Sequence, residues 1–213
     1  PQERDWGVID PEDYASFLRN DWGYGENPLP DMMALAESHG IRLFCLPSVG
    51  NEVDAFSFYF QSIPYIAINS QKSAERIRFD IAHEIGHLVM HDSLDNAVIG
   101  ARDIEKEAQE FAANLLMPQH RVLSLLPENC STANILEAKQ YFRVSAMAMV
   151  YRVHELGKLS DWEYRQVCRD LTEAGYRSSE LKGIKREESQ IFSFVARNNR
   201  KKGISINTIS EET

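Results

Sequence analysis

Apolar residues follow two different spacings along the chain, and each spacing predicts a different kind of element. Short stretches that are compact and apolar, or that alternate at period two, predict β-strands. The alternation is clearest where Phe56, Phe58 and Phe60 share one side of a strand. The predicted strands cover residues 41–46, 54–61 and 64–69.

Elsewhere apolar residues recur every three or four positions, which is typical of amphipathic helices. The longest such stretch runs from Ser73 to about His91, and Pro118 ends the one that follows. A short helical part, three strands and an all-helical remainder predict an α+β fold, with a small sheet packed on the long helices. The predicted helices cover 11–20, 31–39, 73–91, 103–117, 134–142, 146–156 and 162–174.

Composition narrows the class of partner and the location. The 213 residues include 32 acidic and 23 basic ones, a net charge of −9, and residues 1–181 alone carry −12. Such a body is a poor general binder of nucleic acid, because phosphate contacts need clustered Lys and Arg. No apolar run is long enough to span a membrane, and no signal peptide is visible. Three widely spaced cysteines argue against a disulfide framework, so we expect a cytoplasmic protein.

The sharpest chemical feature is the segment His83-Glu84-Ile85-Gly86-His87, inside the predicted helix 73–91. Residues four apart lie on one face of a helix, so both imidazoles can reach one metal ion. Glu84 leaves on a neighbouring face, where it can take a proton from a metal-bound water. The alternative interpretation is that the same sequence places two histidines and a glutamate on the surface of a helix without a metal. The apolar flanks favour the metal site, because burying these groups without a partner would be costly.

A catalytic zinc site has three protein ligands and one open position, so the next helix should supply the third. Glu105 and Glu107 differ by about 200° around that helix, so only one of them can face the metal. Glu105 is favoured, because Gln109 lies one turn further on and can hydrogen-bond a liganding imidazole. Helical geometry leaves Glu107 open as the alternative.

Two blocks of sequence resemble the ImmA/IrrE family of metallo-endopeptidases. They are residues 75–91, around the histidine pair, and 105–118, which resemble that family's E-x-x-A-N-x-F-A-A-x-L-L-M-P signature. Gln109 departs from it, because the family usually has Asn, His or Asp at that position. The resemblance implies that Glu105 is the third ligand of one zinc ion per chain. It also implies a gluzincin-like core, a bacterial or phage origin, and cleavage of a regulatory protein such as a Cro-type repressor or an antitoxin.

The predicted mechanism assigns Glu84 as the general base, which then passes the proton to the leaving amine. A further donor should stabilise the oxyanion, and the candidates are His91, Tyr65 and Tyr24. His91 lies about 12 Å along the helix from His83, too far to share its metal. We expect it to interact with the helix dipole rather than face the substrate. Residues 64–69 are either an edge strand open to an extended substrate or an ordinary core strand.

The predicted elements divide the chain into a zinc metallopeptidase core over 1–128, a helix-turn-helix-like subdomain over 129–180 and a basic, flexible tail over 181–213. The subdomain raises the question of DNA binding. Its second helix begins with apolar residues 146–149 and carries Arg152 and His154 only late, so direct DNA binding is not expected. The alternative function is a non-catalytic zinc-containing regulator, or a toxin–antitoxin component that binds a partner protein or DNA.

Overall fold

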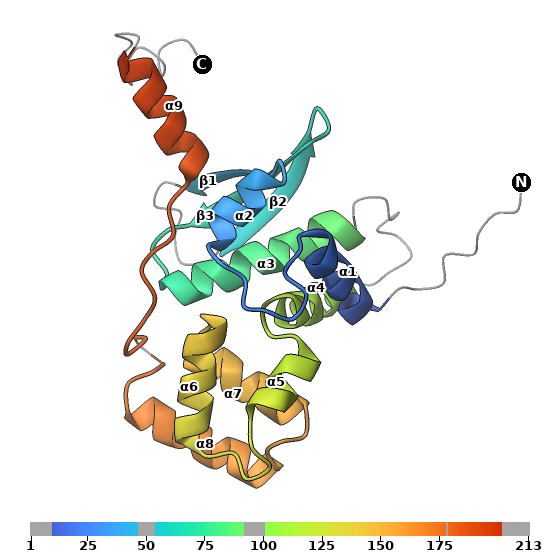
Figure 1. Ribbon diagram of the computed structural model, residues 1–213, viewed down its shortest axis with the longest axis vertical. Coiled ribbons are helices and arrows are strands. Elements are labelled where there is room, and N and C mark those ends of the chain that lie inside the picture. The colour runs from blue at the N-terminus through green and yellow to red at the C-terminus, as the bar shows by residue number, and fades with distance from the viewer. Residues whose placement is uncertain (1–9, 47–53, 92–100, 178, 202–213) are drawn as a thin grey trace, which may run out of the picture.

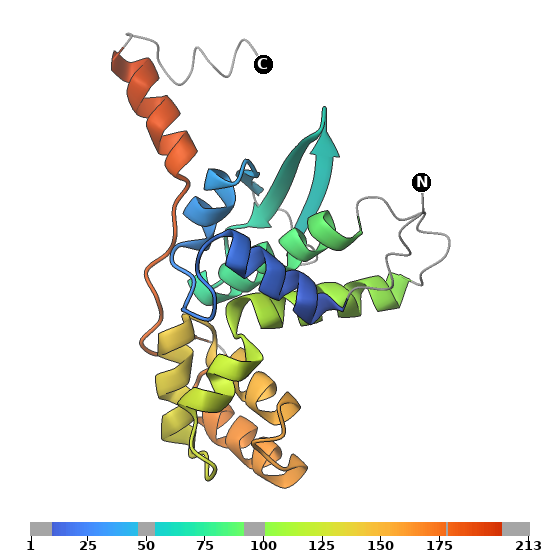
Figure 2. The ribbon, with the colours of Figure 1, turned by 45° about the vertical axis from the view of Figure 1, so that its right-hand side comes forward.

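The computed structural model describes residues 10–46, 54–91, 101–177 and 179–201, and it has the predicted α+β character (Figure 1). The sheet and the long helices lie together, and the later helices form a separate layer beside them (Figures 1 and 2). Within the described residues, no helix is both long and apolar enough to cross a membrane. In chain order the elements are α1 (Pro11–Asp21), α2 (Met32–Ser38), β1 (Arg42–Leu46), β2 (Ala55–Phe60), β3 (Ile63–Asn69), α3 (Ala74–Met90), α4 (Ala101–Leu116), α5 (Gln119–Leu125), α6 (Thr132–Phe142), α7 (Ala146–Glu155), α8 (Asp161–Glu173) and α9 (Gln190–Lys201).

The three strands form one sheet in the order β1-β3-β2. β3 pairs in parallel with β1 and antiparallel with β2, with Tyr65 opposite both Arg42 and Phe58. β3 is therefore the central strand of the described sheet, and the idea that it forms an open edge is wrong. Its residues Ile66 and Ile68 are fully buried, as expected for a strand enclosed by neighbours. The edge beside α3 is instead β2.

Helix α3 covers one face of the sheet and positions the chemistry of the molecule. Ser73 caps it by accepting a hydrogen bond from the backbone N–H of Arg76. Ile81 and Ile85 are buried between the sheet and the helices, which is the role that their helical spacing predicts. The segment His83–His87 therefore lies on a helix held by the core.

Gly86 allows α4 to approach α3 closely. A Cβ atom at this position would lie 2.9 Å from Cδ1 of Phe111, a fully buried residue of α4. No side chain fits there without a shift of Phe111 or of its helix. The glycine of the motif thus sets the distance between the helix that carries His83 and His87 and the helix that carries Glu105.

The helical layer contains α5, which the sequence analysis did not predict, followed by the expected α6, α7 and α8. Pro118 ends one helix and is the N-terminal cap of the next, so its role as a helix terminator hid its second role. Arg152 of α7 is buried and donates to Met117 O and Asn114 Oδ1 at the end of α4. Its guanidinium therefore joins the two layers of the molecule and does not face outward.

Residues 180–189, which we name the strap, run along the body between α8 and α9 (Figure 1). Glu187 is buried and its Oε1 accepts from Arg78 Nη1 at 2.7 Å, while its Oε2 accepts from Met32 N at 2.8 Å. Glu180, at the other end, pairs with the buried Lys139 of α6. The strap is thus tied to both layers by buried ion pairs. Its residues 181–189 belong to the range predicted as a flexible tail, and they lead into α9.

Candidate metal centre

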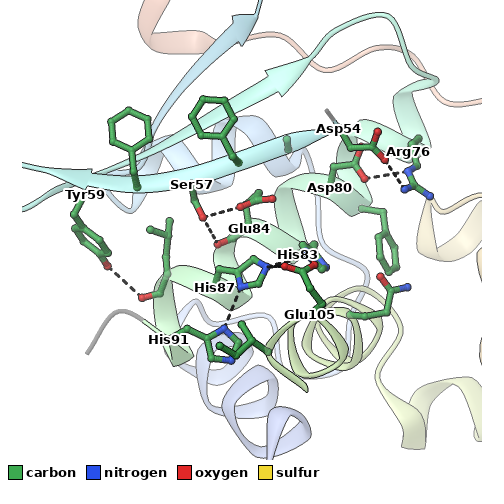
Figure 3. Close-up of a pocket in the computed structure, with 17 residues that line it drawn as sticks. Asp54, Ser57, Tyr59, Arg76, Asp80, His83, Glu84, His87, His91 and Glu105 are labelled. Carbon is green, nitrogen blue, oxygen red and sulfur yellow. Dashed lines mark hydrogen bonds and ion pairs between the residues drawn. The ribbon is translucent and has the colours of Figure 1, made fainter. Parts of the chain in front are cut away.

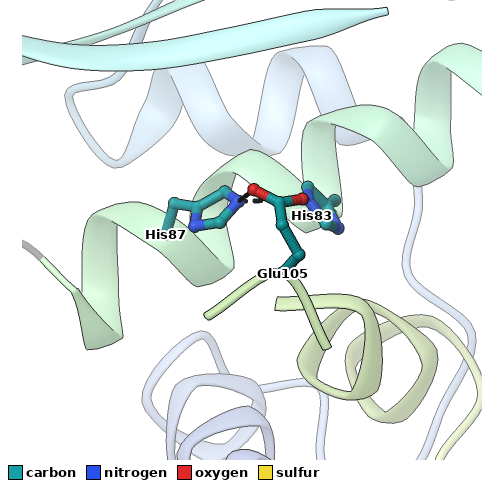
Figure 4. A group of neighbouring side chains, drawn as sticks. All are labelled: His83, His87 and Glu105. Atoms are coloured by element: carbon teal, nitrogen blue, oxygen red, sulfur yellow. Dashed lines mark hydrogen bonds and ion pairs between the residues drawn. The ribbon is translucent and has the colours of Figure 1, made fainter. Parts of the chain in front are cut away.

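Three side chains from two helices converge beside the sheet (Figure 4). His83 and His87, one turn apart on α3, have their Nε2 atoms 3.1 Å from each other. Glu105 of α4 places Oε2 3.2 Å from His83 Nε2 and Oε1 3.3 Å from His87 Nε2. The structure therefore brings together the three residues that were predicted as ligands, with Glu105 rather than Glu107 at the pair of histidines.

The donor set suits a divalent transition metal. Two imidazole nitrogens and one carboxylate are a known set for catalytic zinc. Ligand atoms about 2.1 Å from one ion and at tetrahedral angles are about 3.3–3.4 Å apart. The observed separations of 3.1–3.3 Å among His83, His87 and Glu105 nearly match that requirement. These residues thus fit a zinc-sized ion with small adjustments of their side chains.

The surroundings keep both imidazoles uncharged. The pKa of His87 is lowered to about 4, mainly by burial and in addition by the charge of the neighbouring His83. Burial also lowers the pKa of His83, and in both cases Glu105 opposes the shift. At neutral pH the lowered pKa values favour the neutral form of both rings, which has a free nitrogen lone pair that can bind a metal ion.

Glu84 lies beside the three converging side chains, on the side of the sheet (Figure 3). Ser57 of β2 donates from Oγ to Glu84 Oε2 at 2.7 Å and so fixes the orientation of the carboxylate. Burial raises the pKa of Glu84, the hydrogen bond from Ser57 opposes this, and the charge of Glu105 raises it further. A carboxyl with a raised pKa, held by one hydrogen bond, is suited to accept and return a proton.

His91 lies one turn beyond His87, at the C-terminal end of α3. Its Nδ1 lies 3.1 Å from Nδ1 of His87, and its Nε2 lies 3.0 Å from Oε2 of Glu107. The side chain is only 6% exposed. His91 thus combines a position at the helix end with a contact to a predicted ligand and a place on the wall of the cavity. Glu107, the alternative third ligand, instead contacts the far histidine.

Of the three remaining candidate residues, Gln109, Tyr65 and Tyr24, only Gln109 lies at the centre. Gln109 lines the cavity next to the centre, but Tyr65 stacks on Phe58 with 5.3 Å between the ring centres, on the face of the sheet turned away from α3. Tyr24 packs against the hydrophobic core and is not among the residues that line the cavity. The structure thus brings Gln109 to the centre and leaves both tyrosines away from it.

Two residues of β2 that the sequence analysis did not single out contact the site. Ser57 contacts Glu84, and Tyr59 donates from its hydroxyl to Leu88 O at 3.3 Å beside the cavity (Figure 3). Their contacts with Glu84 and Leu88 show that both point toward α3, and the alternation of a strand directs Phe56 and Phe58 to the other face. The period-two pattern of this strand was the available signal, since it places Ser57 and Tyr59 on one face.

The centre opens into a cavity of about 860 Å³ between β2, α3 and α4. Glu105 is 65% exposed and borders this space, so the centre is accessible from the cavity. At the end toward the start of α3, Arg76 contacts Asp54 Oδ2 at 2.8 Å and Asp80 Oδ1 at 3.0 Å. The cavity therefore has a charged end and an aromatic-lined strand along one side.

Comparison of the sequence with models of protein families gives a match. A family model described as the IrrE N-terminal-like domain, of peptidase family M78, matches residues 36–154, which is more than half of the chain. No curated protein matches the chain at a significant level. The matched range includes the three strands, α3 with its histidine pair, and α4 with Glu105.

Proposed function

The chain belongs to peptidase family M78, the IrrE N-terminal-like proteins, and from that membership we propose that it is a zinc-dependent endopeptidase. Members of a metallopeptidase family need a metal, and His83, His87 and Glu105 are proposed to hold one zinc ion. The observation that carries this proposal is the convergence of three donor atoms, all within 4.8 Å of one another, beside an oriented and buried glutamate.

Zinc supplies Lewis acidity when bound, because it acidifies a water molecule and polarises the scissile carbonyl. Glu84 accepts the proton of the attacking water at its carboxylate and delivers it to the leaving nitrogen. The hydrogen bond from Ser57 to Oε2 leaves the other oxygen of Glu84 available for this transfer. The raised pKa of Glu84 favours its acceptance of the proton, because burial makes the protonated form less unfavourable relative to the carboxylate than it is in water.

The substrate is proposed to bind as an extended segment along β2. In an antiparallel pair, every second residue directs its N–H and C=O toward the partner strand. Asp54 and Asn69 are such a pair, since Asn69 N donates to Asp54 O, so Ala55 and Ser57 direct their backbone groups to the outer side. A peptide that adds to this edge would pass through the cavity beside Glu84 and the zinc ligands.

The family resemblance also guides the choice of substrate and the description of the fold. We propose a gluzincin-like arrangement for the core over 1–128 and a helix-turn-helix-like arrangement for α6 and α7 in the subdomain over 129–180. A helix-turn-helix repressor or an antitoxin is the proposed class of substrate. The buried position of Arg152 supports a protein substrate over DNA as the partner, because that cation is already engaged within the molecule.

Glu84→Gln tests the proposal most directly. The purified wild type and the variant are incubated with zinc and a helix-turn-helix repressor or antitoxin, and also with a mixture of unstructured peptides, and products are identified by mass spectrometry. We expect cleavage by the wild type and a loss of at least about 10²-fold in Glu84→Gln, because general base catalysis contributes that much or more. Bound zinc, measured by elemental analysis, should be retained in the variant.

Glu110→Gln provides the matched control, because Glu110 is a carboxylate of α4 that pairs with Lys106 and does not line the cavity. It should keep full activity. His83→Ala and Glu105→Ala should lose both zinc and cleavage. Equal products from wild type and Glu84→Gln would contradict the peptidase assignment. A partner that binds both proteins equally and stays uncut would favour a non-catalytic, zinc-containing binding protein.

A further inference from the structure

The side chains of Glu107, His91 and His87 form a row of hydrogen-bonding contacts that ends at the candidate metal centre. His91 stands at the C-terminal end of α3, one turn after His87, and both of its ring nitrogens have partners. Glu107 approaches from α4 and is 33% exposed, whereas His91 is almost fully buried. A buried imidazole with two ordered contacts is therefore placed directly behind one of the proposed ligands (Figure 3).

The two ends of this row, a metal-binding nitrogen of His87 and the carboxylate of Glu107, determine which ring nitrogen carries each hydrogen. A neutral imidazole has one nitrogen that donates and one that accepts. If His87 presents the lone pair of Nε2 to a metal, its Nδ1 must carry the hydrogen and donate to His91 Nδ1. His91 then carries its hydrogen on Nε2 and donates it to Glu107, whose carboxylate can only accept. One arrangement of hydrogens satisfies all the contacts at once.

We propose that His91 and Glu107 are positioning residues that hold the imidazole of His87 with Nε2 toward His83 and Glu105. This inference rests on the proposed function, because it takes His87 to be a metal ligand. Glu107 acts through His91 and touches neither metal nor substrate. Groups that hydrogen-bond the outer nitrogen of a liganding histidine fix its tautomer and its orientation, and their loss typically weakens metal binding 10–100-fold.

The placement on two helices gives the arrangement a second consequence. Helix α4 contributes Glu105 to the centre and Glu107 to the contact behind it, while α3 contributes all three histidines. The close approach at Gly86 fixes both carboxylates at once relative to the histidines. His87 is therefore held from both sides by the same pair of helices.

The test measures zinc affinity by competition with a chromophoric chelator, with Glu107→Ala and His91→Phe beside the wild type. We expect zinc binding 10–100-fold weaker in both variants. Glu107→Gln retains an oxygen that can accept from His91, so it should recover part of the loss. Glu110→Ala, a carboxylate one turn further along α4 that pairs with Lys106, should bind zinc like the wild type.

Two spectroscopic readouts separate positioning from a general loss of structure. In the zinc-loaded wild type, nitrogen-15 NMR should find the hydrogen of His87 on Nδ1 and that of His91 on Nε2. In the cobalt-substituted protein, Glu107→Ala should change the visible absorption of the metal while circular dichroism keeps the wild-type helix content. Glu107 is partly exposed, so this variant tests the inference even if His91→Phe fails to fold.

The possible failures are distinguishable. Tight zinc binding in the wild type with unchanged affinity and cobalt spectrum in Glu107→Ala would overturn the positioning role and leave the peptidase proposal intact. The opposite tautomer of His91 would likewise overturn the positioning role alone. A folded wild type that binds no zinc would overturn the proposed metal centre, and the positioning role would fall with it.

Discussion

Helix α3 carries ionisable side chains along its whole length, and its two halves surround them differently. In the first half, the guanidinium of Arg78 is fully buried and meets Glu187, and the carboxylate of Glu75 accepts from a backbone N–H of the strap. In the second half, His83 and His87 meet each other and Glu105, beside an open cavity. The buried cation of the first half has a counter-charge inside the protein, while the second half brings together groups that all donate electron pairs.

The difference shows what marks a functional site on a buried helix. Burial alone does not, because Arg78 is more buried than either histidine. The mark is the convergence of lone pairs without a buried cation beside them, which is the arrangement that the proposed metal ion would complete. The following predictions separate the two halves by experiment.

Glu187→Gln should have the largest effect on stability. It leaves the buried guanidinium of Arg78 without its nearest counter-charge, and removal of one partner of a buried pair costs about 3–5 kcal/mol. Urea unfolding at pH 7 measures the change. Glu188→Gln, the exposed neighbour, should change the free energy of unfolding by less than about 0.5 kcal/mol. A similar small change in Glu187→Gln would mean that the strap does not stabilise the core.

The second half of α3 should respond to metal instead. Zinc at about 1,000 times its Kd should stabilise the wild type by about 4 kcal/mol, because it binds the folded state only. The same zinc should give His83→Ala almost no gain, while His120→Ala, whose side chain is 83% exposed, should behave like the wild type. Thermal unfolding with zinc and with a chelator measures both. An equal gain in His83→Ala would place the stabilising metal elsewhere.

Gly86→Ala should show a smaller loss that links the two helices. Helix propensity alone predicts a gain of about 1 kcal/mol from this change. The new Cβ would meet Phe111, and such overpacking costs about 1–3 kcal/mol, so we expect a net loss of about 1 kcal/mol. Zinc affinity should fall as well, since Glu105 moves with α4. Adding Phe111→Leu should recover part of the loss of affinity, and a stabilised, tight-binding Gly86→Ala would contradict the close packing.

A further difference is expected in the pH dependence of the metal-free protein. The pKa of His87 is about 4 in the folded chain and about 6.5 in an unfolded chain, so the unfolded state binds more protons between these values. The free energy of unfolding should therefore fall as the pH falls from about 6.5 to 4. His87→Gln should reduce this slope and His120→Gln should not. Urea midpoints measured with a chelator give the comparison, and equal slopes in all three proteins would contradict it.

The sequence predicted the parts of the site that depend on local spacing. Positions 83, 84 and 87 follow from one helical turn, and the choice of Glu105 agrees with the geometry. The contact of Ser57 with Glu84 was not predictable, because it joins a strand to a helix 27 residues later. The pairing of His91 with Glu107 was not predicted, because Glu107 was considered only as the alternative ligand and His91 only as a residue at the helix end or near the substrate.

The sheet shows a signal that was present but given too little weight. β3 contains the run Ile66, Ala67 and Ile68, all fully buried, whereas β2 alternates apolar and polar residues. A continuous apolar run indicates a strand enclosed on both faces, and alternation indicates one with an exposed face. The strap could not be predicted in this way, since nothing local distinguishes Glu187 from its neighbour Glu188, and its partners are far away in the sequence.

The strap also sets an order of events during synthesis. It is made after all the residues that it contacts in the body, with Glu187 following Arg78 by 109 residues and Met32 by 155. A chain that grows from its N-terminus therefore holds Arg78 without its counter-charge until residue 187 has left the ribosome. Helix α3 reaches its full stability only then, so a partly made chain has the motif of a protease before it has the rigid helix that the proposed chemistry needs.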